Sequence, residues 1–220
     1  LENNNRLAVL NINLANEVAV RKKAEEDVLR RERQYRAVTA LLTKPLTDPQ
    51  ALFDVILDNA MYLVKSPDGY ISLYEEKTPG FRVCHCRGAY VPFLHEVQPL
   101  TTGMEGLVYK QKELLYVPDY SGFAGRVEDE RLAGLKSVVM LPLLQEHEVK
   151  GVLTISWRQE QLLQKEDVVT LQQFADLALV ALEHLRVQEK MHRLAYFDAL
   201  TGLPNRENVK EKLMQCLAEE

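Results

Sequence analysis

The spacing of hydrophobic residues changes twice along this chain, and that change limits what the chain can fold into. Residues 7–42 contain no Gly or Pro and are rich in Glu, Arg, Lys and Ala, which is typical of a long helix. From the Pro67-Asp68-Gly69 turn to residue 157, apolar residues alternate or form short runs, which indicates β-strands. Residues 165–196 return to a helical spacing. The sequence therefore predicts a β-rich domain between two long helices.

The first helix carries a heptad repeat. With Leu7 at position a, most a and d positions between residues 7 and 42 are apolar, which favours a pair of helices over a solitary one. Charged residues at Glu17, Arg21 and Arg31 interrupt the repeat and would weaken the pairing. We therefore predict that residues 1–44 form a signalling helix that pairs as a coiled coil. Its many charges favour ion pairs on a solvated helix over contact with nucleic acid.

The helix predicted at 165–196 has two apolar faces. One face suits packing on a sheet and contains Leu171, Phe174, Ala178, Leu182 and Leu185. The other face has residues alternately three and four positions apart: Leu177, Val180, His184, Val187, Met191 and Leu194. A helix with two apolar faces packs against two partners, and the simplest second partner is the same helix of another copy. We predict a homodimer through the N- and C-terminal helices, with these six residues as its seam.

Composition narrows the function classes. The net charge of −5 argues against a nucleic-acid surface, which needs a concentrated basic patch. No apolar run reaches the roughly 18 residues of a membrane span, so no membrane contact is expected within this chain and a cytoplasmic location is predicted. Cys84, Cys86 and Cys216 form no disulfide framework, which suits a reducing compartment. A longer parent protein attached to a membrane stays open.

Local signals place two further elements. Thr47-Asp48-Pro49 predicts the start of a helix, with Asp48 as its N-cap and Pro49 as its first residue. Residues 138–144 and 149–155, joined by a short polar link, predict a central β-hairpin. A short helix is expected after Gly103, and an irregular loop is expected over residues 118–134.

Several segments, in this order along about 120 residues, resemble the GAF domain. The first is a glycine-bearing helix start at 103–108, and the second is a strand that runs into an Asp-containing turn at 115–120. The last two strands of the family resemble 135–143 and 149–155, and the family's exit helix resembles 166–183. The resemblance implies an α+β fold: an antiparallel sheet of about five or six strands, with the first and last helices on one face and a small-molecule pocket on the other.

The resemblance also sets the domain boundaries. It implies a GAF core over 45–164, followed by an exit helix and coiled-coil linker over 165–197. The best candidate ligand surface is the loop after the strand at 115–117, because a pocket for a small ring needs aromatic walls and a few fixed polar groups. The candidate residues are Tyr116, Asp119, Tyr120, Phe123, Arg126 and Arg131. In the alternative interpretation Asp119 caps the loop and the tyrosines are a half-buried rim.

Two ligand classes are disfavoured. The segment 123–130 lacks the Asn-Lys-Phe-Asp-Glu pattern of cyclic-nucleotide-binding relatives. Cys84-His85-Cys86 is a poor metal site, because alternate residues of a strand point to opposite faces, so no metal site is predicted. A bilin chromophore on this Cys-His pair is the alternative, but the pair lies on the second predicted strand and the surrounding phytochrome-like motifs are missing. Ordinary strand residues are the favoured interpretation.

A nine-residue motif follows the second long helix. It reads Asp198-Ala199-Leu200-Thr201-Gly202-Leu203-Pro204-Asn205-Arg206 and resembles the entry of GGDEF domains, the catalytic domains of diguanylate cyclases. Here Gly202 permits an unusual turn, Pro204 stiffens it and Asn205 can cap the next helix. The resemblance implies that 198–220 is the truncated start of such a domain. This fragment would have no catalytic residues and no cofactor, whereas the parent enzyme would need Mg²⁺ and GTP.

Together these features predict the regulatory part of a diguanylate cyclase, in which a GAF domain sends a signal through paired helices to an output that makes cyclic di-GMP. Two alternatives stay open. The GAF domain could be a ligand-free dimerisation scaffold, or the parent could carry an additional phosphodiesterase domain.

Overall fold

The computed structural model describes residues 22, 49–198, 201, 203–206, 208–210 and 214. By its internal contacts the chain divides into two units, Leu1–Leu46 and Thr47–Glu220. Lys22, which is helical, is the one described residue of the first unit. The coiled coil expected at 1–44, and Asp48 as an N-cap, therefore lie outside the described residues.

The second unit is built on a six-stranded antiparallel sheet, as the sequence predicted. The strand order is β3-β2-β1-β6-β5-β4, so the first and last long strands are neighbours at its centre. The predicted hairpin forms the pair β5 and β6. The strands are β1 (Asp68–Glu75), β2 (Gly80–Arg87), β3 (Val97–Pro99), β4 (Leu115–Val117), β5 (Ser137–Gln145) and β6 (Glu148–Trp157).

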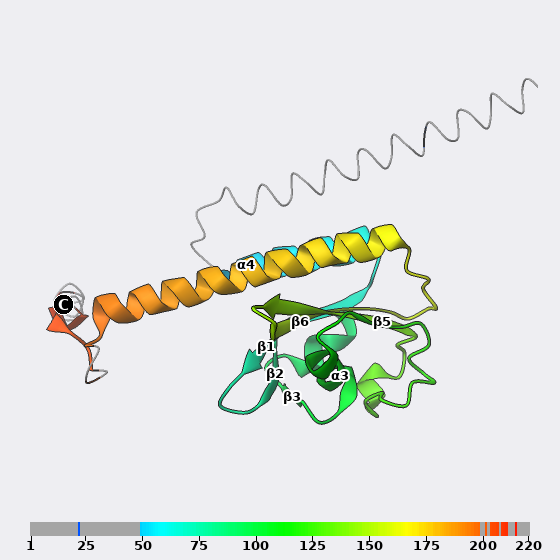
Figure 1. Ribbon diagram of the computed structural model, residues 1–220, viewed down its shortest axis with the longest axis horizontal. Coiled ribbons are helices and arrows are strands. Elements are labelled where there is room, and N and C mark those ends of the chain that lie inside the picture. Colours follow the sequence, from blue (N-terminus) through cyan, green and yellow to red (C-terminus); the bar gives the residue numbers. More distant parts are fainter. Residues whose placement is uncertain are drawn as a thin grey trace, which may run out of the picture. The chain divides into compact units, whose positions relative to one another are not determined.

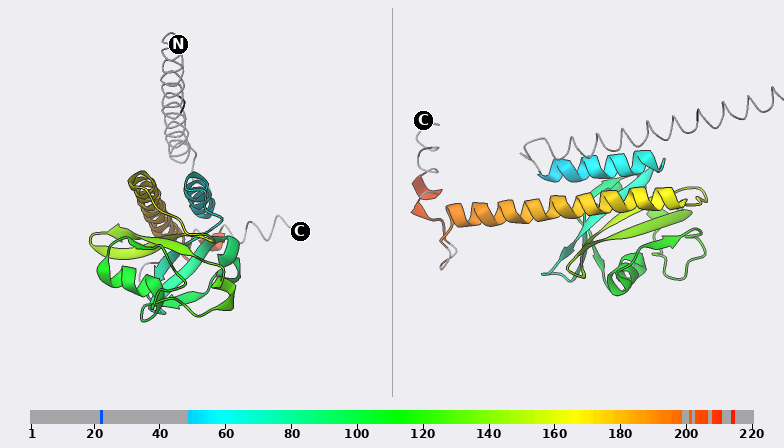
Figure 2. Two further views of the ribbon diagram at one scale, coloured as in Figure 1. Left: turned by 90° about the vertical axis from the view of Figure 1, so that its right-hand side faces the viewer. Right: turned by 45° about the horizontal axis from the view of Figure 1, so that its top comes forward.

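Two helices, α2 (Pro49–Leu63) and α4 (Lys165–Tyr196), lie side by side on one face of this sheet (Figures 1 and 2). Both start where the sequence predicted, at Pro49 and at Lys165. Their inner faces are fully buried and include Phe53 on α2 and Phe174 on α4. The packing of these apolar faces supplies most of the helices' stability, since propensity alone rarely holds a helix in water.

The opposite face carries the shorter elements. These are η1 (Gly88–Phe93), α3 (Gly103–Gln111) and η2 (Glu130–Leu132). Together with the sheet they enclose a buried cluster, here called the cavity-side cluster, which includes Tyr70, Tyr90, Met104, Tyr120 and Met140. The short helix after Gly103 was expected from the sequence, whereas η1 and β3 were not.

The pleat of the central strands divides their side chains between the two faces. Tyr70 pairs with Thr154 and points to the cavity-side cluster, while Ile71 pairs with Leu153 and points to the helices. Both faces are buried, so these strands read as nearly continuous apolar runs and not as a simple alternation. One layer of backbone therefore separates the cluster from the long helix.

Helix α4 has 32 residues, which corresponds to about 48 Å, and it projects beyond the sheet (Figure 1). Gln164 and Asp167 close a capping box at its start. By length and composition α4 could cross a membrane, but its first half is a core helix in which Leu171 and Ala178 are fully buried. Burial of this half in the domain accounts for its apolar composition.

The chain turns at the end of α4. Asp198 Oδ1 accepts hydrogen bonds from the Thr201 amide and hydroxyl, and Phe197 forms a β-bridge with Pro204. Asn205 Oδ1 accepts a hydrogen bond from the Asn208 amide at 3.0 Å, which is the N-cap predicted for this residue. Ala199, Leu200 and Gly202 lie outside the described residues.

Candidate functional site

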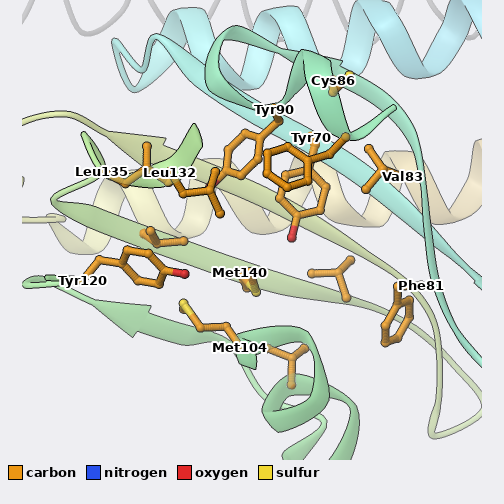
Figure 3. Close-up of a cluster of buried hydrophobic side chains, with 14 of the residues drawn as sticks. Tyr70, Phe81, Val83, Cys86, Tyr90, Met104, Tyr120, Leu132, Leu135 and Met140 are labelled. Atoms are coloured by element: carbon orange, nitrogen blue, oxygen red, sulfur yellow. The ribbon is translucent and has the colours of Figure 1, made fainter. Parts of the chain in front are cut away.

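A small cavity of about 50 Å³ opens inside the cavity-side cluster, on the sheet face opposite α2 and α4. Figure 3 shows the cluster around it, with the Tyr120 hydroxyl pointing inward toward Met104 and Met140. The lining is mostly aromatic and aliphatic and includes one carboxyl group. It consists of Tyr70, Val83, Tyr90, Phe93, Gln98, Thr102, Gly103, Met104, Glu105, Tyr120, Val127, Leu132, Val138 and Met140.

Helix α3 brings that carboxyl group to the cavity. Gly103, with φ +74°, adopts a left-handed conformation that favours glycine at the start of the helix. At Gly106 a Cβ atom would lie 2.3 Å from the Leu100 carbonyl oxygen, so only glycine permits this close approach. With α3 held in this way, the first turn places Met104 and Glu105 in the interior, where both are buried. The positions of Gly103 and Gly106 therefore determine where the carboxyl group of Glu105 lies.

Glu105 is a buried acid with neutral neighbours. The Ser72 hydroxyl on β1 donates to Glu105 Oε1 at 2.6 Å, and the Tyr70 phenol also interacts with the carboxyl group. Burial raises the pKa of Glu105 from 4.5 to about 7, and these two hydrogen bonds offset part of the rise. The carboxyl group therefore changes charge near neutral pH.

The tyrosines around it remain neutral. Burial raises the pKa of Tyr70, Tyr90 and Tyr120 above the ordinary value of a phenol. Tyr70 lies near Thr154, and Tyr90 lies near Ser156, on the neighbouring strand β6. These contacts fall short of full hydrogen bonds, since Thr154 Oγ1 and Ser156 Oγ have no partner of hydrogen-bond geometry among the described residues. Both hydroxyl groups lie on β6, outside the residues that line the cavity.

Comparison with known proteins identifies this architecture. The sequence model of the GAF domain matches residues 47–183, which is more than half of the chain. This chain belongs to the GAF domain family. No curated protein matches it. The family assignment makes the unit a sensory and regulatory domain, and the cavity lies on the sheet face where the resemblance placed a pocket.

Solved structures agree with the GAF assignment. The chain is similar to the GAF domain of a phosphoenolpyruvate-protein phosphotransferase from Acinetobacter, with a TM-score of 0.64, 16% identity, and 74% of this chain and 98% of that one covered. For the corresponding domain from Coxiella burnetii the TM-score is 0.66 and the identity is 11%, with 73% of this chain and 96% of that one covered. For free methionine-R-sulfoxide reductase from Neisseria meningitidis the TM-score is 0.63 and the identity is 15%, with 74% of this chain and 93% of that one covered. At these identities the likeness shows the fold alone.

Two of the six ligand residues predicted from the sequence line a second hollow of the GAF domain. Tyr120 and Arg126 border this space of about 390 Å³, formed by the loop 120–135, and Tyr120 also lines the cavity. Phe123 stacks beside Tyr120, with ring centroids 6.5 Å apart. The loop therefore brings three of the six residues together at the edge of the cavity-side cluster.

The other three predicted ligand residues contact the protein itself. Tyr116 donates its hydroxyl hydrogen to the Gln161 carbonyl, and Asp119 Oδ1 accepts from the Ser121 and Gly122 amides. Arg131 lies 3.7 Å above the Phe93 ring and forms ion pairs with Glu96 and Asp129. Arg131 thereby joins η2 to η1 beside the cavity, and Asp129 N-caps η2. Whether any of the six binds a ligand stays a prediction.

The Cys84-His85-Cys86 segment lies on β2. His85 Nδ1 is 3.1 Å from Asp54 Oδ1, and its ring stacks on Phe53 of α2. In the part of the chain that the structure describes, no group of three potential ligands could hold a metal ion. Burial raises the pKa of both thiols, which disfavours the reactive thiolate.

The six predicted seam residues occupy one side of α4. Toward the end of the helix they are increasingly exposed, from 43% at Val180 to 66% at Met191. Val187 and Leu194 are also exposed, and Leu177 is half-buried. Single exposed apolar residues are common on protein surfaces, but a stripe at heptad spacing is typical of a helix that pairs. The geometry leaves this stripe accessible within one copy of the chain.

Sequence reasoning missed the acid of the site, Glu105, and the aromatic walls Tyr70, Tyr90 and Phe93. An acid in the first turn of a helix normally faces solvent and interacts with the helix dipole. One signal was available, because Glu105 lies between Met104 and Gly106 in the glycine-bearing segment of the GAF resemblance. Close approach of the backbone at Gly106 requires that this turn be packed against the domain.

The raised pKa of Glu105 predicts how stability depends on pH. Below about pH 4.5 the carboxyl is protonated in both the folded and the unfolded state, so its contribution to stability is fully present. As pH rises from about 4.5 to about 7, the unfolded state releases this proton while the folded state still holds it. The contribution of the protonated carboxyl to stability is therefore lost over this range. We expect the free energy of unfolding to fall by about 3 kcal/mol between pH 4.5 and 8 relative to the Glu105→Gln variant. Urea unfolding at several pH values measures it, and parallel curves for the two proteins would contradict it.

Proposed function

We propose that this GAF domain is the sensory part of a diguanylate cyclase, and that its α4 helices pair and pass the signal to a GGDEF domain. The fragment itself contributes no catalytic residue. In this proposal the parent enzyme binds GTP and Mg²⁺ and works in the cytoplasm, with or without a membrane anchor elsewhere in the protein. The observation that carries the proposal is the motif that begins at Asp198, directly after α4.

The local structure of that motif supports the proposal. Asn205 Nδ2 donates to the Ala195 carbonyl at 2.7 Å, and Asn208 Nδ2 donates to the Tyr196 carbonyl at 3.1 Å. Both acceptors are carbonyl groups of the last turn of α4, and the Asn205 amide also donates to the Tyr196 carbonyl at 2.9 Å. The side chains after the turn thereby bind the end of the helix. A rotation of α4 would therefore carry the following segment with it.

Pairing of α4 supplies the route for the signal. Two GTP molecules are joined only when two active sites face one another, so the spacing and rotation of paired helices can control the reaction. A ligand in the GAF domain changes this arrangement only by its difference in affinity for two states of the pair. The seam of α4, from Leu177 to Leu194, is the surface that we assign to this pairing.

The size of the cavity supports a second candidate, a GAF scaffold without ligand. Drug-sized ligands occupy pockets of roughly 300–1,000 Å³, far above the 50 Å³ found here. In a scaffold the domain would only space the helices. The two candidates differ in whether any small molecule binds the cavity.

The test uses the protein extended beyond Glu220, supplied with GTP and Mg²⁺. We expect it to form cyclic di-GMP. A seven-residue insertion between Arg186 and Val187 preserves the heptad phase and should preserve regulation, whereas a two-residue insertion rotates the helix end by about 200° and should change the activity. Absence of cyclic di-GMP from the extended protein would refute the proposal, and equal effects of the two insertions would exclude transmission through helix phase.

A further inference from the structure

The charged groups that line the cavity disfavour a negatively charged ligand. Glu105 is the one acid in the lining, and the lining contains no Lys, Arg or His. Glu105 is only 4% exposed. An anionic ligand would meet this acid without any compensating cation, so a phosphate or a carboxylate is disfavoured.

The aromatic walls of the cavity favour a positively charged ligand. Tyr70, Tyr90, Phe93 and Tyr120 line the cavity from β1, η1 and the loop after β4. One face of Phe93 is already covered by Arg131, so the three tyrosine rings offer the open faces. The faces of such rings attract cations within about 6 Å, and the effect is stronger where water is excluded. Tyr70 and Tyr90 already lie together, with ring centroids 4.5 Å apart. Aromatic rings around a single buried acid form an environment suited to an organic cation.

We propose that the cavity binds a small organic ammonium ion, with Glu105 as the counter-charge and the four aromatic rings as the walls. This inference deepens the proposed sensory function and rests on it, because it assigns the chemical class of the sensed molecule. The ammonium hydrogens would approach the Glu105 carboxyl group beside Ser72 and Tyr70, which already interact with it. The methyl or methylene groups would contact the rings and Met104.

The cavity volume limits the size of the ion. One water molecule needs about 10–15 Å³ measured in this way, so 50 Å³ admits about three to five groups of the size of a water molecule. Methylammonium to trimethylammonium fit this limit. A nucleotide does not fit the cavity as it stands.

Binding should depend on pH through Glu105. The ionisable groups that line the cavity with it are Tyr70 of β1, Tyr90 of η1 and Tyr120 of the loop, all of which remain neutral near pH 7. An ammonium ion keeps its charge well above this pH. Because the ion binds the carboxylate, affinity should rise about tenfold between pH 6 and pH 8 as Glu105 ionises near pH 7.

Calorimetric titration with trimethylammonium chloride tests the inference, with tert-butanol as a neutral probe of similar shape and acetate as an anion. We expect trimethylammonium to bind, more tightly at pH 8, and Glu105→Gln to weaken binding at pH 8 at least tenfold and to remove its pH dependence. Glu113→Gln, an exposed acid just after α3, is the matched control and should bind as the wild type does. Circular dichroism verifies that both variants fold.

The outcomes separate this inference from the proposed function. No binding of trimethylammonium, or equal binding by the Glu105→Gln variant, overturns the inference. Tighter binding of tert-butanol or acetate also overturns it, and leaves a sensory pocket of another chemical class. If trimethylammonium binds as expected but the extended protein makes no cyclic di-GMP, the inference stands and the proposed function fails.

Discussion

Glutamate at both Val187 and Met191 is expected to convert the proposed dimer into a monomer. These side chains are 53% and 66% exposed within one copy, so the substitutions should leave the GAF core folded. In a paired seam the two copies would bring four carboxylates into an apolar contact, at a cost of about 3 kcal/mol or more. That cost weakens association more than about 100-fold. Sedimentation equilibrium across micromolar concentrations measures it.

The control for this variant is Arg186→Glu. It lowers the net charge by two, as the double substitution does, but lies one residue before Val187 at heptad position c, outside the seam. We expect it to remain a dimer. A wild-type protein that sediments as a monomer, or a double variant that remains a dimer, would show that α4 does not pair through this stripe.

Alanine at Phe174 should give the largest loss of stability among single changes in α4. Phe174 is 1% exposed on the face of α4 that covers the sheet, so its removal leaves a cavity between the helix and the strands. Such truncations cost about 3–5 kcal/mol. Guanidinium unfolding at a fixed protein concentration should show a lower midpoint with an unchanged slope.

Val169→Ala is the matched change on the same helix. Val169 is 58% exposed and lies outside the seam, so we expect a change within about 0.5 kcal/mol. A loss below about 1 kcal/mol for Phe174→Ala would mean that α4 packs on the sheet much more loosely than its burial indicates.

The long elements were predictable from the sequence because their periodicity is strong. Helix α4 runs over Lys165–Tyr196, the range predicted, and β5 and β6 form the hairpin expected around residues 145–148. The 3₁₀ segment Gly88–Phe93 was missed, since it is short and contains Pro92 in place of any repeating pattern. At its start Asp68 Oδ1 accepts a hydrogen bond from the Ala89 amide, a contact between residues far apart in sequence.

The site was predicted only in part, for a physical reason. Tyr120 was identified because an aromatic residue after a strand end commonly borders a pocket, and it lines the cavity. The role of Arg131 depends on Phe93 and Glu96, which approach it only through the tertiary fold. Likewise, the direction of Glu105 depends on the contact between Gly106 and Leu100. Side-chain directions in loops and short helices arise from such contacts and leave no periodic signal.

The helical order of the projecting end of α4 is expected to depend on the concentration of the protein. Among the residues of α4 whose exposure the structure describes, Leu182 is the last that is buried. Glu183 still accepts a hydrogen bond from Gln145 of β5, and the helix beyond it is mostly exposed. An isolated helix of about this length is marginal in water. Association with a second copy would therefore supply part of the free energy that keeps this segment helical. Amide hydrogen exchange in 183–196 should slow as the protein is concentrated, while exchange in β6 stays constant.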